Sequence, residues 1–158
     1  MRLYLACLAF ACGCSSANYY YSFDLTNAGA RNVTKPGERD ILDDAELKSE
    51  ILVDPTSFQA VLLDLTNKTE APIQVGWDNI SIVGPDHKQQ PLRPDGPMPP
   101  TVEPGAQLMA RLVQFALPPS GSAARFYDNS DFELVVPMVV RGTPTERRYA
   151  MHVRLTKL

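Results

Sequence analysis

Residues 58–83 read FQAVLLDLTNKTEAPIQVGWDNISIV, and this stretch decides the fold class. Val61, Leu63 and Leu65 are spaced two apart, and Asp64 falls between them. Because successive side chains of a strand point to opposite faces, this spacing predicts a strand with an apolar inner face.

The second half of the same stretch repeats the pattern. Residues 67–72 (NKTEAP) have the composition of a polar turn. Ile73, Val75 and Trp77 then alternate with polar residues and glycine, and residues 80–83 continue as a short strand. Trp77 is therefore predicted to lie in the core of a sandwich and not to serve as a ligand platform.

Toward the C-terminus the alternation becomes longer. A strand is predicted at about 106–115, and two long runs follow at 132–140 and 149–155. Residues 142–147 contain glycine and proline and turn the chain back, so the two runs should form an antiparallel hairpin. Pro137 lies inside the first run and predicts a bulge or an edge position there.

Two segments are harder to assign. Residues 91–104 (PLRPDGPMPPTVEP) contain six prolines, which predict a rigid loop with polyproline II character. A PxxP ligand for a partner domain is the alternative interpretation of that loop. Residues 41–53 partly fit a helix and partly alternate, and a strand over about 46–53 is favoured.

The elements add up to seven or eight short strands and no long helix. Such a set predicts an all-β fold, an antiparallel two-layer sandwich occupying residues 46–158.

Several motifs in this domain resemble those of a group of small bacterial lipoproteins with immunoglobulin-like sandwiches. The matching segments are LTNKT at 65–69, IQVGWD at 73–78, the turn at 83–88 and VEPG at 102–105. The resemblance covers about the last 110 residues. It implies an immunoglobulin-like β-sandwich and a lipid anchor, and it brings no catalytic residues.

The start of the chain has the layout of a secretory signal. One arginine precedes an apolar run of about ten residues, which is too short for a permanent membrane span. Ala11, Cys12, Gly13 and Cys14 resemble the lipobox of bacterial lipoprotein precursors, in which the cysteine is acylated and becomes the new N-terminus. Acylation at Cys12 and cleavage as an ordinary signal peptide are the alternatives.

This interpretation divides the chain and sets its location. Residues 1–13 are the signal peptide, Cys14 carries the lipid, and residues 14–45 form a tether and loop region. All three cysteines lie within the first fourteen residues, so no disulfide framework is expected in the mature domain. By resemblance to the sorting pattern of such lipoproteins, Ser15 in place of an aspartate would permit sorting to the periplasmic side of the outer membrane if the cell is Gram-negative.

No constellation of residues predicts catalysis. The net charge is −3 and the sequence contains no basic stripe, so nucleic acid is not expected as a partner. His87 and His152 are expected at the surface, and the acidic residues of 40–46 lack the spacing of a calcium loop. Ser120 and Ser122 lack a nucleophile elbow. No metal, cofactor or catalytic residue is predicted.

The expected function is accordingly a non-enzymatic, envelope-anchored module that binds another protein or braces an envelope assembly. The alternative is a receptor for a small ligand or carbohydrate, which uses the aromatic rings of Tyr19, Tyr20, Tyr21 and Tyr127.

Overall fold

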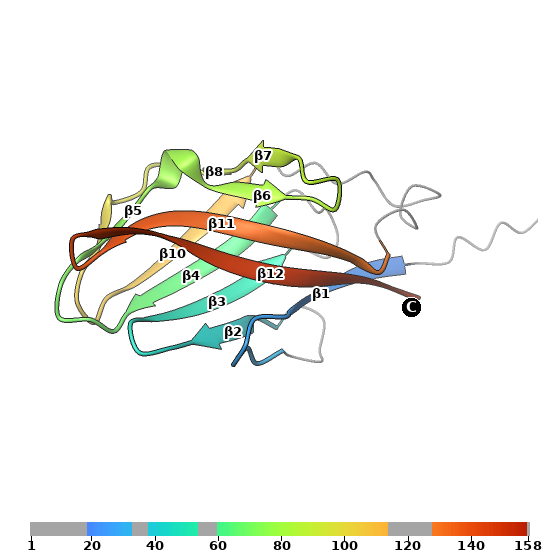
Figure 1. Cartoon of the computed structure of the whole chain (residues 1–158), viewed down its shortest axis with the longest axis horizontal. Coiled ribbons are helices and arrows are strands. Elements are labelled where there is room, and N and C mark those ends of the chain that lie inside the picture. The colour runs from blue at the N-terminus through green and yellow to red at the C-terminus, as the bar shows by residue number, and fades with distance from the viewer. Residues whose placement is uncertain (1–18, 33–37, 54–59, 114–127, 158) are drawn as a thin grey trace, which may run out of the picture.

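The computed structural model describes residues 19–32, 38–53, 60–113 and 128–157. Within these ranges the chain is all-β, and its strands form two antiparallel sheets. The sheets lie face to face as two layers (Figure 1). The prediction of an all-β, antiparallel fold is confirmed.

Sheet I has seven strands and is built around the longest two, β11 and β12. Its strands are β1 (Tyr19–Leu25), β12 (Thr143–Lys157), β11 (Ser130–Val140), β5 (Ile73–Val75), β9 (Thr101–Val102), β6 (Ser81–Val83) and β7 (Gln89–Pro91). Five of them follow one another in the order β1-β12-β11-β5-β9. β6 also pairs with β11, and β7 pairs with β6.

Sheet II has five strands and supplies the opposite layer. Its order is β2 (Asp40–Asp43), β3 (Leu47–Val53), β4 (Ala60–Asn67), β10 (Gln107–Val113) and β8 (Arg93–Pro94). A single 3-10 turn, η1 (Trp77–Asn79), is the helical element of the described chain.

The number of strands differs from the expectation. The described residues form twelve strands instead of seven or eight, and one sheet curls into a half-barrel. Much of the excess comes from β7, β8 and β9, which lie in or beside the proline-rich segment expected to be a loop. Proline is tolerated there because these strands are two or three residues long and lie at sheet margins, as Pro94 does opposite Leu112.

The predicted C-terminal hairpin is confirmed. β11 and β12 pair antiparallel from Ser130↔Val153 to Val140↔Thr143. The turn is tighter than expected: it consists of Arg141 and Gly142, with φ of 50° and 78°. Positive φ at both central residues is the requirement of a type I′ turn, whose twist matches that of the strands.

Residues 41–53 form two strands and no helix. β3 confirms the strand favoured at about 46–53, and β2 pairs with it antiparallel. Asp44 makes the turn between them, because its Oδ1 accepts hydrogen bonds from the backbone N–H groups of Glu46 (2.8 Å) and Leu47 (2.9 Å). β1 and β2 both lie within the segment 14–45, to which the sequence assigned a tether and loop region, and both are members of the sheets.

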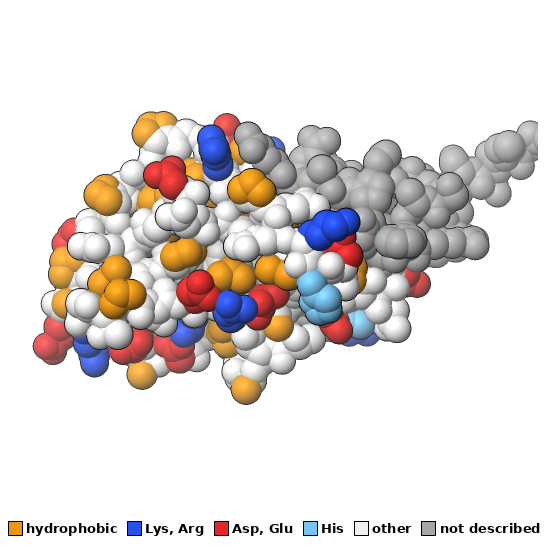
Figure 2. Space-filling model, turned by 45° about the horizontal axis from the view of Figure 1, so that its top comes forward, with side chains coloured by type: hydrophobic (Ala, Val, Ile, Leu, Met, Phe, Trp, Pro, Cys, Tyr) orange, Lys and Arg blue, Asp and Glu red, His pale blue; other side chains and the backbone are white. Residues whose placement is uncertain are grey.

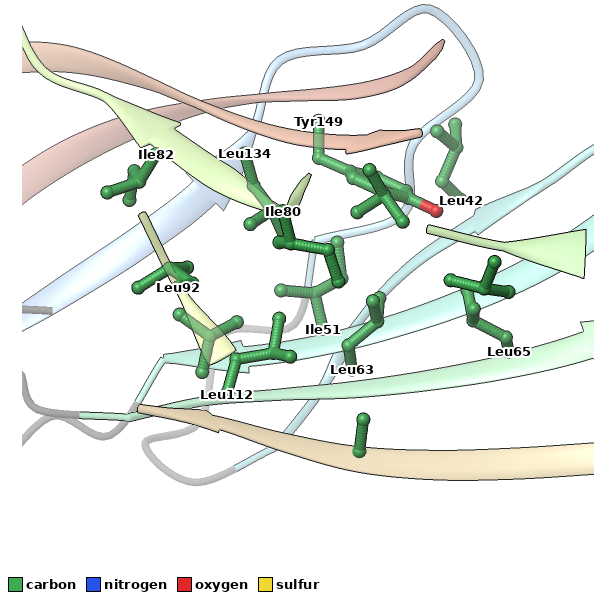
Figure 3. Close-up of a cluster of buried hydrophobic side chains, with 14 of the residues drawn as sticks. Leu42, Ile51, Leu63, Leu65, Ile80, Ile82, Leu92, Leu112, Leu134 and Tyr149 are labelled. Atoms are coloured by element: carbon green, nitrogen blue, oxygen red, sulfur yellow. The ribbon is translucent and has the colours of Figure 1, made fainter. Parts of the chain in front are cut away.

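The core lies between the layers. Val61, Leu63 and Leu65 are fully buried, as their alternation predicts. Figure 3 shows side chains of the two sheets meeting, with Tyr149 of β12 extending toward sheet II. The large, fully buried side chains that fill this space include Leu63, Leu65, Ile73, Ile80, Ile82, Leu92, Leu112, Leu134, Tyr149 and Met151.

Residues 89–95 link the sheets along one side. β7 pairs with β6 of sheet I, and β8 pairs with β10 of sheet II. Between them the N–H of Leu92 donates to the carbonyl of Ile80 at 2.9 Å, and the Leu92 side chain is fully buried. One short segment therefore changes sheets and covers the margin of both, which protects edges that would otherwise pair with other chains.

Candidate functional site

A break in sheet I lies beside a pocket of the described structure, and Pro137 lies at that break. β11 pairs with β5 as far as Val75 and with β6 from Ser81. Between these two pairings, the five residues 76–80 face only two residues of β11, 136 and 137. The Pro137 carbonyl accepts a hydrogen bond from Gly76 N at 2.8 Å. Since N and O of one strand residue point the same way, the N–H that proline lacks would face this break. Residues 76–80 bulge away from β11, whereas β11 itself pairs with β12 without interruption, so of the predicted bulge or edge position the structure shows Pro137 locally at an edge.

The residues released from the ladder turn outward as η1. Asn79 N donates to the Gly76 carbonyl at 3.0 Å and closes the 3-10 turn. Trp77 stays buried, with 8% of its surface exposed, and joins the core as predicted. Its indole Nε1 donates to the Pro99 carbonyl at 2.8 Å, so the tryptophan also fastens the proline-rich loop to the bulge.

A pocket of about 440 Å³ lies between η1 and this loop. The volume is within the usual range for small-molecule sites, about 300–1,000 Å³. Its apolar wall comes from Val75, Trp77, Pro94, Pro97, Met98 and Pro100, and its polar side chains are those of Asp78, Asn79 and Arg93.

The two charged residues of the pocket have opposite signs and are not paired. η1, which carries Asp78, lies next to β8, which carries Arg93. Neither side chain forms an ion pair or hydrogen bond with another described residue, and both residues are exposed. The site therefore offers one free acceptor group and one free donor group beside an apolar wall.

Two of the sequence motifs meet in space and prove to be structural. The side chain of Asn67 donates from Nδ2 to the carbonyls of Ala71 and Val102, both at 2.8 Å. Its Oδ1 accepts from the backbone N and the hydroxyl of Thr69, again at 2.8 Å. Gly105 N donates to the Asn67 carbonyl at 2.9 Å. LTNKT and VEPG are thus two halves of one buried turn junction in which every Asn67 side-chain group is satisfied.

A charged cluster covers the outer face of sheet II. Asp64 was expected on this solvent side, yet it is buried because Arg39 and Gln107 lie over it. Its Oδ2 accepts from Arg39 Nη1 at 2.9 Å and from Gln107 Nε2 at 2.7 Å, whereas the buried Oδ1 has no partner. The Arg39 guanidinium also lies 3.9 Å from Glu50, which faces Asp64 across β3 and β4. Arg39 thereby offsets the repulsion between two directly opposed carboxylates.

A second polar group joins the layers through the core. The hydroxyls of Ser49 in β3 and Tyr149 in β12 share a hydrogen bond of 2.8 Å, and both residues are fully buried. Burial raises the pKa of Tyr149 to about 12. At the rim of this group Arg147 is paired with Asp44. Partial burial by itself raises the pKa of Asp44, but hydrogen bonds from Leu47 and Glu46 and the guanidinium of Arg147 outweigh it, so that the pKa lies below its ordinary value.

The other candidate residues are dispersed. His87 is exposed in a turn at φ 59°. His152 lies on the outer face of sheet I between Asp131 (2.8 Å) and Asn129 (3.1 Å). Of the acidic residues at 40–46, Asp40 accepts from Leu25 N, Asp43 pairs with Lys68, and Glu46 lies 3.8 Å from Arg141.

Several predicted residues lie outside what the structure describes. They are Cys12, Cys14, Ser120, Ser122 and Tyr127, together with the side chains of Tyr19, Tyr20 and Tyr21. Within the described ranges, no group of three or more His, Cys, Asp or Glu side chains is placed to hold a metal ion. The part of the chain with assigned structure has no helix long and apolar enough to cross a membrane.

On the face shown in Figure 2, charged side chains of both signs lie close together and hydrophobic ones form small scattered groups. This face offers no broad field of one sign. No protein-family model matches the chain, and no curated protein matches it significantly.

Proposed function

We propose that the protein is a bacterial envelope lipoprotein, acylated on Cys14, which acts without enzymatic activity as an interaction or structural module. The observation that carries the anchor is the sequence of the first sixteen residues, in which an apolar run ends in Ala11, Gly13 and Cys14 and is followed by serines. A stable attachment needs more than one acyl chain, such as the diacylglyceryl and palmitoyl groups of lipoproteins.

The position of β1 supports the use of such an anchor. Four residues lie between Cys14 and Tyr19, so the five steps from one Cα atom to the next span at most about 18 Å. Tyr19 pairs with Lys157, and both therefore belong to the same end of sheet I (Figure 1). A lipid on Cys14 would hold this end of the domain close to the bilayer.

The pocket supports the binding role. Val75, in its wall, pairs with Met138, only a few residues from the hairpin turn at Arg141 and Gly142. The hairpin turn is at the end of β12 opposite to Lys157 (Figure 1). On an anchored protein the pocket would thus lie away from the membrane, where soluble molecules and other envelope proteins reach it.

The proposal includes a distant relation to immunoglobulin-like sandwiches. Two facing antiparallel sheets and a buried tryptophan support it. The larger number of strands and the curled sheet are departures from that plan.

The anchor is tested by feeding cells an alkyne analogue of palmitate and detecting labelled protein after click chemistry. The wild type and the Cys12→Ser variant are expected to be labelled, and Cys14→Ser is expected to lose the label and to leave the membrane fraction. Loss of label in Cys12→Ser alone, or an unlabelled wild type, would contradict acylation at Cys14.

For the interaction role, crosslinked envelopes should yield a stoichiometric partner, and its repeated absence counts against that role.

A further inference from the structure

We propose that the pocket between η1 and the proline-rich loop binds a small zwitterion with an apolar body, of the chemical class of a free amino acid or a dipeptide. This inference goes beyond the lipid anchor and does not depend on it, because every residue that carries it lies in the described domain.

The first argument is the distribution of unpaired charge. Ion pairs occupy most charged side chains of the described domain, as Arg111 with Asp95 and Arg148 with Glu133 do. Five have neither an ion pair nor a side-chain hydrogen bond with another described residue: Arg31, Glu38, Glu70, Asp78 and Arg93. Two of the five, of opposite sign, line the same pocket. A ligand with one cationic and one anionic group would satisfy both.

The second argument is the geometry of these two groups. Asp78 and Arg93 belong to neighbouring elements, yet their side chains do not pair with each other. A ligand ammonium fits the Asp78 carboxylate, and a ligand carboxylate fits the planar fork of the Arg93 guanidinium, which binds carboxylates through two parallel hydrogen bonds. Two unpaired charges of opposite sign suit a ligand that carries one charge of each sign.

The third argument is the wall. Trp77, Pro94, Pro97 and Met98 are among the residues that line the pocket, and an apolar lining suits the apolar body of the ligand. The wall is also fixed in advance, since four prolines restrict the loop at 94–100 and Trp77 holds it through Pro99. Little ordering entropy is then lost on binding, and a volume of about 440 Å³ accommodates a small molecule and not a long segment.

The test uses Trp77 itself as the probe, because it is the only tryptophan in the chain. The full-length protein, purified in detergent micelles, is titrated with L-leucine while tryptophan emission is excited at the red edge of its absorption band, where tyrosine does not absorb. A saturable change is expected. Leucyl-leucine is the second arm, and a tighter fit for it than for leucine would assign the dipeptide as the better ligand.

Three analogues separate the charges. Leucine amide lacks the carboxylate, N-acetylleucine lacks the ammonium, and N-acetylleucine amide lacks both. Each single loss should weaken binding about tenfold or more, as expected for a hydrogen bond to a charged group. Equal binding of the doubly blocked amide would reduce the site to an apolar surface and overturn the proposal.

Two variants assign each charge to its residue. Asp78→Asn should weaken leucine about tenfold and leave N-acetylleucine unchanged, whereas Arg93→Gln should weaken leucine and leave leucine amide unchanged. Glu70→Gln and Arg31→Gln are matched controls, because they remove unpaired exposed charges outside the pocket. No saturable response to leucine or leucyl-leucine, from protein that still melts cooperatively, would overturn the proposal. A loss of leucine binding as large in the controls as in the pocket variants would do the same.

Discussion

At the scale of single residues, the burial of Tyr149 couples the stability of the fold to pH, whereas its hydrogen bond with Ser49 lowers the pKa and opposes part of that effect. Burial raises the pKa of Tyr149 from 10.0 to about 12. The folded state therefore favours the neutral phenol. The resulting stability is fully present below the unfolded pKa of about 10 and is lost as the pH rises toward the folded pKa of about 12. At 1.36 kcal/mol per pKa unit, a shift of about two units makes the full loss about 3 kcal/mol.

Tyr149→Phe should remove that pH dependence. The free energy of unfolding, measured by urea denaturation between pH about 9 and pH about 12, is expected to fall more steeply in the wild type than in the variant. At neutral pH each single change, Tyr149→Phe or Ser49→Ala, leaves one buried hydroxyl unpaired and should cost about 1–3 kcal/mol. The double variant should cost less than the sum. Equal slopes above pH about 10 would contradict the effect of burial on Tyr149, and additive costs of the two single changes would show that the two hydroxyls are not coupled.

At the scale of elements, the β11–β12 hairpin carries a correctable conflict in its turn. Arg141 has a φ of 50°, a region that is unfavourable for an arginine and well suited to asparagine. Arg141→Asn should stabilise the protein by about 0.5–1 kcal/mol. The change also removes the 3.8 Å ion pair with Glu46, but both partners are largely exposed and the pair is worth a few tenths of a kcal/mol. The gain in the turn should therefore exceed the loss.

The comparison is made by the midpoint of urea denaturation, and Glu46→Gln is the matched control, since it breaks the ion pair and leaves the turn unchanged. Gly142→Ala, at φ 78°, is expected to lower stability by about 1 kcal/mol. If Arg141→Asn lowered the urea midpoint while Glu46→Gln left it unchanged, this account of the turn would be contradicted.

Elements also show where the sequence was sufficient and where it was not. Alternation predicted β4, β5, β10, β11 and β12 because each has an apolar face and a polar face. It missed β7, β8 and β9. These strands have only two or three residues, which is too short to show an alternation of apolar and polar side chains, and they form because the fold brings them beside another strand.

The pocket was partly visible in the sequence. Pro137 predicted the bulge or edge position, because a missing N–H is a property of the residue itself. The contact between the bulge at 76–80 and the proline-rich loop, about twenty residues away in the chain, depends on the hydrogen bond from Trp77 to Pro99. No local sequence pattern predicts this contact. Asp78 and Arg93 were missed for the same reason, since what distinguishes them is the absence of a partner in the fold. The burial of Asp64 likewise comes from Arg39, which is 25 residues distant in the chain.

At the scale of the whole molecule, the short segment after Cys14 and the length of β12 together predict an orientation on the membrane. β12 has 15 residues, so its two ends are about 50 Å apart. The segment from Cys14 to Tyr19 reaches at most about 18 Å. An anchored domain would then hold the end with Tyr19 and Lys157 near the bilayer and the hairpin end farther from it.

Single cysteines can test this orientation, since the sequence has no cysteine after Cys14 and the proposed acylation would block the thiol of Cys14 itself. Asp131→Cys, opposite His152, places a dye toward the anchored end, and Thr143→Cys places one beside the hairpin turn. Energy transfer to labelled headgroups in vesicles should be stronger from position 131, because about nine residues of β12, or about 30 Å, separate the two sites along the strand. Equal transfer from both sites would mean that the domain lies flat or tumbles. In that case the pocket near the hairpin would face the bilayer for part of the time, and a tether of only five residues could not by itself display it to soluble ligands.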